Sequence, residues 1–258
     1  MRNDTIEQVN ETKAVELQPP VAFIEDELAA GFRSLPKVEL HAHLGGSIRV
    51  STVKELLIAQ GRSIAEAEVR AGAMVIPRDE HGVPVEPTPF EGFQIVKEAK
   101  IDTPELCRRT VCEYLEDCAA DGVVYAELRT GGEDLDWMKV ILKGFEDAKQ
   151  AGIDCIPRLI LSIKRDKPAS LAERVVNNAI ALKDCGVVAV DFCGVDTRGN
   201  PFTKEFAAAV RKARAAGLAF VPHFAELTGE EDLLDILDEC PSRLGHAVFM
   251  DENPEVAH

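Results

Sequence analysis

The chain alternates between short apolar runs and longer segments in which apolar residues recur at helical spacing. The run at 187–192, for example, is rich in β-branched residues, and it is followed by a segment at 202–216 whose apolar positions repeat every three or four residues. Short continuous apolar runs predict buried strands, and the longer period predicts amphipathic helices. The alternation occurs six times, so the sequence predicts six successive strand and helix units.

The predicted strands lie at 38–43, 123–129, 153–161, 187–192, 218–223 and near Leu244. The predicted helices lie at 24–32, 51–60, 104–120, 134–151, 169–184, 202–216 and 230–239. Ser51 is the expected N-cap of its helix. Pro222 is the expected last position of its strand, because proline has no N–H to give to a central strand.

Strands this apolar, alternating with helices, predict an α/β fold with a parallel sheet wrapped by helices. A doubly wound sheet and a closed barrel both satisfy the pattern. Polar residues end several of the strands and must converge on one site, which favours a (β/α)₈ TIM barrel. We expect residues 1–35 to form an N-terminal tail with a short helix and residues 36–258 to form the barrel domain.

Composition narrows the function classes. The 258 residues include 46% apolar residues, enough for one barrel, and 45 acidic against 29 basic residues give a net charge of -16. This charge argues against nucleic-acid and anionic-membrane partners and favours a small-molecule substrate. We expect no signal peptide, because the start of the chain is polar, and the sequence has no apolar stretch of about 20 residues. Its seven cysteines include no Cys-x-x-Cys pair, so we expect reduced core thiols of an intracellular protein. We also expect the protein to be a monomer and to be cytoplasmic.

Two histidines two residues apart give the first sign of chemistry. His41 and His43 end the first predicted strand, so their side chains share one face, and the glycines that follow allow a sharp turn. A His-x-His pair is also common as an exposed or hydrogen-bonded pair. His223 and His246, however, fall at the ends of two further predicted strands. His41, His43 and His223 offer three neutral nitrogens, enough for a zinc ion that keeps a position for water and lowers its pKa to about 7.

Three other residues are candidates for chemistry near these histidines. Glu226 follows His223 by three residues and is a candidate general acid, with a solvated loop acid as the alternative. His246 is a candidate proton shuttle, although a structural histidine is equally compatible with its position. Asp191 lies in an apolar strand, where a buried acid needs a partner or a function.

Several motifs together resemble the adenosine and AMP deaminase family of metallo-dependent amidohydrolase barrels. They are PKVELHAHLGGS at 36–47, YAELRT at 125–130, VDFCG at 190–194, HFAE at 223–226 and RLGH at 243–246. The resemblance runs from about residue 33 to 258. It is closest to the subgroup of adenosine deaminase-like proteins, which convert N6-methyl-AMP to IMP and methylamine.

The resemblance implies roles for individual residues. It places one zinc ion per chain on His41, His43 and His223, makes Glu226 the residue that protonates the purine ring, and makes His246 the residue that positions the hydroxide. The substrate contacts that it implies are His43, Gly45, Arg129, Thr130 and Gly194.

Position 45 bears on the choice between a nucleotide and a nucleoside. The adenosine deaminases carry Asp there, close to the ribose 5'-hydroxyl, and this chain carries Gly45. Loss of a carboxylate removes repulsion of a 5'-phosphate and leaves room for it. The alternative is that Gly45 serves only the turn. The expected reaction is therefore deamination of N6-methyl-AMP, with deamination of adenosine as the alternative.

The chain also departs from the family pattern. Val195 stands where Asp is usual, Lys164 where the subgroup has Asp, and Ala247 where Gly is common. Lys164 is a candidate partner for a phosphate. The family's last two strands, which bring a pair of aspartates, have no counterpart before His258. We therefore expect a barrel truncated after about six strands, and a catalytically inactive fragment is a further alternative.

Overall fold

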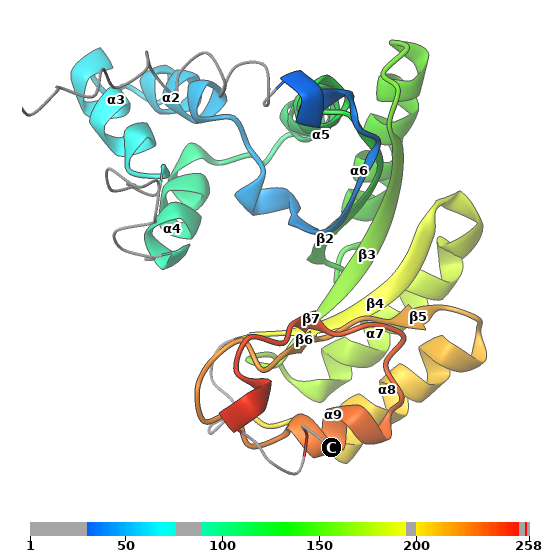
Figure 1. The fold of residues 1–258 in the computed structure, drawn as a ribbon. Helices are drawn as coiled ribbons and strands as arrows, with labels where there is room; N and C mark the ends of the chain where they lie inside the picture. The colour runs from blue at the N-terminus through cyan, green and yellow to red at the C-terminus, as the bar shows by residue number, and fades with distance from the viewer. Residues whose placement is uncertain (1–29, 76–88, 195–199, 253–255, 257–258) are drawn as a thin grey trace, which may run out of the picture. The chain divides into compact units, whose positions relative to one another are not determined.

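Figure 1 shows the computed structural model, which describes residues 30–75, 89–194, 200–252 and 256. The chain divides into two compact units, residues 1–35 and 36–258. In the first unit residues 30–34 are helical. The remainder of the helix predicted at 24–32 lies outside the described residues. The elements below all belong to the second unit.

Five parallel strands form the main sheet, in the order in which they occur along the chain. They are β1 (Lys37–His43), β2 (Val123–Gly131), β3 (Ile156–Lys164), β4 (Val187–Cys193) and β5 (Ala219–Phe220). Because parallel neighbours cannot be joined by a tight turn, each strand needs a crossover before the next one. The alternation predicted from the sequence therefore gives the sheet its order.

Pro222 divides the strand predicted at 218–223. β5 ends at Phe220, and a second short strand, β6 (His223–Phe224), follows the proline and pairs with β7 (Gly245–His246) in a separate two-stranded sheet. The prediction that Pro222 ends its strand was therefore wrong, because the extended chain resumes at His223. The proline lacks the N–H that continuous pairing requires, which gives a physical reason for the break.

Helices cover one face of the main sheet (Figure 1). They are α5 (Pro104–Ala120), α6 (Leu135–Gln150), α7 (Ala169–Ala181) and α8 (Lys204–Ala215), with the short α9 (Leu233–Asp238) after β6. The largest hydrophobic cluster joins these helices to the strands beneath them. The cluster on the other face consists of Ile160, Ala189 and Val221, with Val188 and Ala219 packed against it, and contains no helical residue. Helices on one face only are typical of a barrel, which confirms the predicted α/β barrel class.

The described part of the connection between β1 and α5 includes three α-helices. They are α2 (Val50–Ala59), α3 (Ile64–Gly72) and α4 (Pro89–Ala99), and they share a second hydrophobic cluster. Only α2 was predicted. The expected cap at Ser51 was wrong, since the helix begins one residue earlier, after Arg49, and has no side-chain cap.

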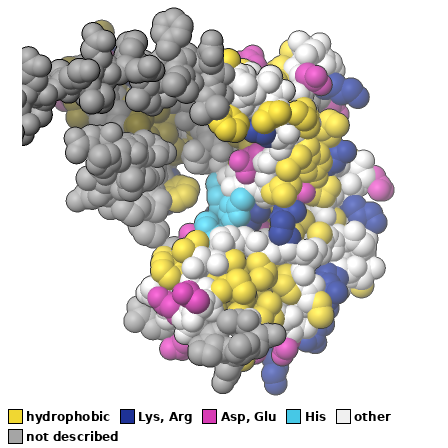
Figure 2. All heavy atoms as spheres, in the orientation of Figure 1, with side chains coloured by type: hydrophobic (Ala, Val, Ile, Leu, Met, Phe, Trp, Pro, Cys, Tyr) yellow, Lys and Arg dark blue, Asp and Glu magenta, His cyan; other side chains and the backbone are white. Residues whose placement is uncertain are grey.

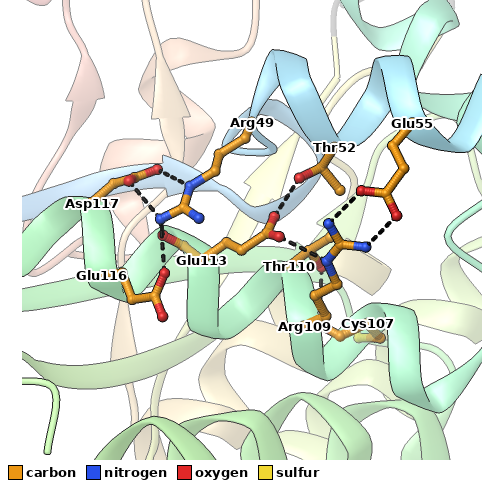
Figure 3. A network of polar contacts seen from close by, with 9 residues as sticks. All are labelled: Arg49, Thr52, Glu55, Cys107, Arg109, Thr110, Glu113, Glu116 and Asp117. Atoms are coloured by element: carbon orange, nitrogen blue, oxygen red, sulfur yellow. Dashed lines mark hydrogen bonds and ion pairs between the residues drawn. The ribbon is translucent and has the colours of Figure 1, made fainter. Parts of the chain in front are cut away.

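A polar network fixes α2 against α5 (Figure 3). Arg49 forms ion pairs with Glu116 and Asp117, and the Thr52 hydroxyl donates to Glu113 Oε2 at 2.6 Å. Arg109 also bonds Glu113, and it pairs with a carboxylate of α2. The network fixes the start of α2, which lies a few residues after the His-x-His segment.

All seven cysteines are free. Cys107, Cys118 and Cys155 are buried as expected, whereas Cys185 and Cys240 are exposed, so the expectation of core thiols was wrong for these two. Both occupy short connections, Cys185 in a 3-10 turn before β4 and Cys240 just after α9. Within the described ranges, no helix is long and apolar enough to cross a membrane.

Candidate metal centre and active site

Three imidazoles, two from β1 and one from β6, converge at one place. The Nε2 atom of His223 lies 2.9 Å from Nε2 of His43 and 3.3 Å from Nε2 of His41. β1 supplies the rings of His41 and His43 from one face of the strand, as the side-chain period of two predicts. β6, in the two-stranded sheet, supplies the ring of His223. Figure 2 shows histidine side chains gathered at one place on the visible face, beside basic side chains.

Asp191 is hydrogen-bonded to the His223 ring nitrogen that does not face the other two histidines. His223 Nδ1 lies 2.9 Å from Asp191 Oδ1, and the Ser162 hydroxyl donates to the other carboxylate oxygen at 2.8 Å. Asp191 is fully buried, which by itself raises its pKa, but its charge interaction and hydrogen bond with His223 lower the pKa to about 2. An ionised carboxylate only accepts, so it accepts the proton of Nδ1, and the Nε2 atom of His223 faces His41 and His43.

The other two histidines are neutral at pH 7. Burial, followed by the positive charge of Arg129, lowers the pKa of His41 to about 3. Burial, followed by the interaction with His223, lowers the pKa of His43 to about 4. Neutral imidazoles are the form that binds metals, so low pKa values remove competition from protons.

The donor set fits zinc. Zinc bonds histidine nitrogen at about 2.0–2.1 Å, which separates two nitrogens of a tetrahedral site by about 3.3 Å. The separation of 3.3 Å between His41 and His223 matches this value, and the 2.9 Å between His43 and His223 is slightly shorter. His41, His43 and His223 also form a group whose ligand atoms all lie within 4.8 Å of one another.

Glu226 and His246 lie beside this group. Glu226 Oε1 is 3.7 Å from His246 Nε2, and the His246 ring centroid is 4.5 Å from that of His41. Burial lowers the pKa of His246. Ala225 and His246 both have a positive φ, of 45° and 57°, so the backbone leaves the extended conformation directly after β6 and at the last residue of β7. The structure therefore brings together the predicted acid, the predicted shuttle and the three predicted ligands.

Two predicted substrate contacts share a cavity. Gly45 and Thr130 line a cavity of about 410 Å³, together with Lys97 and Lys100. A Cβ at Gly45 would meet nothing within 4 Å, and its φ is not positive, so neither space nor backbone conformation requires glycine there. The two lysines were missed because the sequence pattern predicted no element at α4.

Arg129 does not face solvent. Its side chain is 1% exposed, and its guanidinium donates to the carbonyl of Leu40 at 3.1 Å and lies 3.5 Å from Asp191. This position favours a role in holding Asp191, and contact with a nucleotide remains a prediction. Gly194 directly follows β4 and has a φ of 128°, which glycine alone adopts readily.

Two departures from the family pattern can be placed. Lys164 ends β3, is exposed, and reaches 3.1 Å from the point where a Cβ on Gly131 would lie. Ala247 has a φ of 56°, a conformation that the more common glycine adopts without strain. Val195 lies outside the described residues.

Gly245 is a functional candidate that the sequence analysis missed. A Cβ at this position would lie 2.7 Å from His41 Cε1 and 2.9 Å from His41 Nδ1, closer than atoms can pack. In the sequence, the position of Gly245 directly before the candidate residue His246 could have drawn attention to it. Gly245 leaves the space in which the His41 ring sits.

Alanine at position 245 is expected to weaken zinc binding by about 10- to 100-fold, the loss typical of displaced ligand support. The added methyl group would push against the His41 ring. Competition with a chromophoric chelator measures the affinity, and Gly45→Ala, which adds a methyl group in open space, is the matched control. Equal affinities for the two variants would contradict a role for Gly245.

A family model described as adenosine deaminase matches residues 36–258. This chain belongs to the adenosine deaminase family. Among curated members, the N6-mAMP deaminase of Arabidopsis thaliana is 30% identical over 249 residues, which cover 84% of this chain and 67% of the relative.

Solved structures agree with this family assignment. Arabidopsis ADAL complexed with GMP matches with a TM-score of 0.70 and 30% identity, over 86% of this chain and 68% of that one. A zinc-bound amidohydrolase from Burkholderia ambifaria matches with a TM-score of 0.72 and 26% identity, over 94% and 65%. The chain spans about two thirds of the length of its curated relatives, from 62% to 67%.

Proposed function

We propose that the protein is a zinc-dependent deaminase that hydrolyses a 6-substituted purine nucleotide, N6-methyl-AMP, to IMP and methylamine. The convergence of His41, His43 and His223, with Asp191 fixing the third ring, carries the proposal. These three histidines would hold zinc, which when bound supplies a Lewis acid for activating water.

The neighbouring residues account for the protons. Addition of water at C6 needs a proton on the purine ring, and the Glu226 carboxyl group would donate it. The neutral His246 imidazole would accept a proton from the attacking water, because burial keeps its pKa below the ordinary value. Return of protons to the leaving nitrogen releases methylamine and leaves the oxygen on C6.

The cavity beside Gly45 favours a nucleotide over a nucleoside. The protein is strongly acidic, yet the charged residues that line this cavity are two lysines, Lys97 and Lys100, against one carboxylate, Asp102, and no carboxylate occupies position 45. A 5'-phosphate would be attracted to the two ammonium groups. The complexes of Arabidopsis ADAL with GMP and IMP support the same substrate class.

Replacing both Lys97 and Lys100 by alanine is expected to raise the KM for N6-methyl-AMP by at least about 10-fold, the loss of one to two charge-assisted contacts. Turnover of N6-methyladenosine, which has no phosphate, should not change. Lys139→Ala/Lys143→Ala removes the same net charge from α6 and is the control for long-range attraction. Equal losses on both substrates would contradict a phosphate site at this cavity.

An assay of methylamine and ammonia release tests the function. The 258-residue chain is given N6-methyl-AMP, AMP or adenosine, each with added zinc and again with a chelator. We expect chelator-sensitive methylamine release from N6-methyl-AMP to exceed release from the other two. Preference for adenosine would instead establish the nucleoside deaminase.

A catalytically silent purine-binding protein is the second candidate. Within the described ranges, none of the residue groups able to hold a metal joins His41 and His43 to a carboxylate. Binding of IMP without release of amine from any substrate would establish this alternative. For either candidate we propose a monomer in the cytoplasm, where the seven free thiols would stay reduced.

A further inference from the structure

A buried ion pair lies behind the proposed site and has no part in the chemistry above. Arg165 directly follows β3, and Asp232 directly precedes α9. Arg165 Nη1 donates to Asp232 Oδ2 at 2.8 Å, and both side chains are 2% exposed. Burial of two charged side chains costs a considerable desolvation free energy, so the buried position of this pair needs an explanation.

The pair joins segments that follow three different strands. The Arg165 backbone N–H donates to the carbonyl of Cys193 at 2.9 Å, which ties the end of β3 to the end of β4. Arg165 Nη1 also donates to the carbonyl of Asn200 at 3.2 Å, and Asp232 Oδ2 accepts the Phe202 N–H at 2.7 Å. The segment entering α8 and the segment that leads from β6 to α9 therefore meet at one carboxylate.

Arg165 also sets the position of Gly194. A Cβ on Gly194 would lie 2.5 Å from Arg165 Cγ, so the aliphatic part of the arginine occupies the space beside the glycine. The guanidinium carbon lies 4.6 Å from the centre of the Phe192 ring, which fixes the same strand end. Glu226 lies six residues before Asp232, and the Leu227 N–H donates to the Glu230 carboxylate at 3.2 Å within that connection.

We propose that Arg165 and Asp232 form a positioning pair that holds the Gly194 strand end and the Glu226 segment in one arrangement for the purine. The inference rests on the proposed function, in which Glu226 protonates the purine ring, and on Gly194 as the substrate contact that the family resemblance implies. Neither member of the pair is placed against substrate, so it acts through the backbone that it fixes. Displacement of a catalytic group by about 1 Å is enough to lower a rate about 100-fold.

Stability alone is a weak reason for the pair. Buried ion pairs are often replaced by apolar residues of similar volume without loss of stability. This pair is also imperfect, because Arg165 Nε and Asp232 Oδ1 are buried without a hydrogen-bond partner among the described residues. An arrangement that leaves two polar atoms unsatisfied is better explained by the geometry that it imposes.

The test uses the double variant Arg165→Met/Asp232→Leu, which removes the charges and keeps the volume. Its matched control is Arg211→Met/Glu239→Leu, since Arg211 Nε donates to Glu239 Oε2 at 2.8 Å and joins α8 to the other end of α9. We expect the first variant to raise the KM for N6-methyl-AMP and the Kd for IMP at least 10-fold and to lower kcat, with one zinc still bound. The control should keep wild-type values.

A purely structural role would reduce the fraction of active protein at an unchanged KM, and that result would overturn the inference. Hydrogen exchange gives a readout that does not depend on deamination. Peptides covering 190–194 and 224–232 should exchange at least 10-fold faster in the first variant, while those covering β1 and β2 should not change. Wild-type exchange in both segments would also overturn the inference.

Two further results separate the possible failures. If the wild-type chain releases no amine and binds no IMP, the proposed function fails, and the exchange measurement still decides whether the pair couples the two segments. If the double variant does not fold, the same measurements are made on Arg165→Lys, which keeps the charge and loses the planar fork. Wild-type KM, Kd and exchange in that variant would overturn the inference.

Discussion

Asparagine at position 223 is expected to lower the affinity of the chain for zinc by more than about 100-fold. Loss of a residue that merely orients a ligand costs about 10- to 100-fold in affinity, and His223 is placed as a ligand itself. Its Nε2 atom is the one that approaches both other rings. Competition with a chromophoric chelator measures the affinity, and circular dichroism shows whether the variant has folded.

Variants of the neighbouring residues test which group holds the metal. His41→Asn and His43→Asn should match His223→Asn, and Asp191→Asn should lose about 10- to 100-fold because it only orients a ring. His246→Asn is the control, since His246 lies beside the three ligands. A loss in His246→Asn as large as that in His41→Asn would favour the alternative group of His223, Glu226 and His246.

Glutamine at position 226 is expected to lower kcat by about 100- to 10,000-fold, the usual contribution of a general acid. The amide keeps the shape of the side chain and removes the proton that the purine ring needs. Because Glu226 lies outside the group of three histidines, zinc affinity should not change, and the KM should stay within a few-fold. Steady-state release of methylamine from N6-methyl-AMP measures both constants.

Glu231→Gln supplies the control for this change. Glu231 is an exposed carboxylate in the same connection, so its neutralisation changes the charge equally without reaching the site. An equal loss in both variants would show that the net charge of the segment matters and that Glu226 is not the acid. Retention of wild-type kcat by Glu226→Gln would contradict the assignment directly.

The strands and helices with clear periodicity were predictable. β1, β2 and β4 occur within two residues of the expected positions, because apolar runs bounded by glycine or charged residues leave little choice. β3 begins at Ile156 and not at 153, since the three residues before it complete the turn that follows Gly152. α3 and α4 were not predicted, because their amphipathic pattern is short and interrupted.

Those parts of the candidate site that depend on the spacing of residues along the chain were predictable. Those that depend on how side chains pack in three dimensions were not. The His-x-His pair follows from the period of a strand, and the need of Asp191 for a partner follows from its apolar neighbours. Sequence alone could not show that the Arg129 side chain is buried, because a long side chain near the end of a strand can turn either toward the protein interior or toward solvent. The contact between Gly245 and His41 joins residues far apart in the chain and appears only in three dimensions.

The two ends of the proposed zinc site are separated by a long stretch of chain. His43 and His223 lie 180 residues apart, and the group of His41, His43 and His223 includes no residue from the βα connections between them. The entropy lost when a loop closes grows only with the logarithm of its length, so doubling this separation would cost about 0.6 kcal/mol. Insertions in those connections would therefore change which molecules reach the three histidines and leave their affinity for a metal almost unchanged. Substrate specificity can diverge in such a framework while the metal centre is retained.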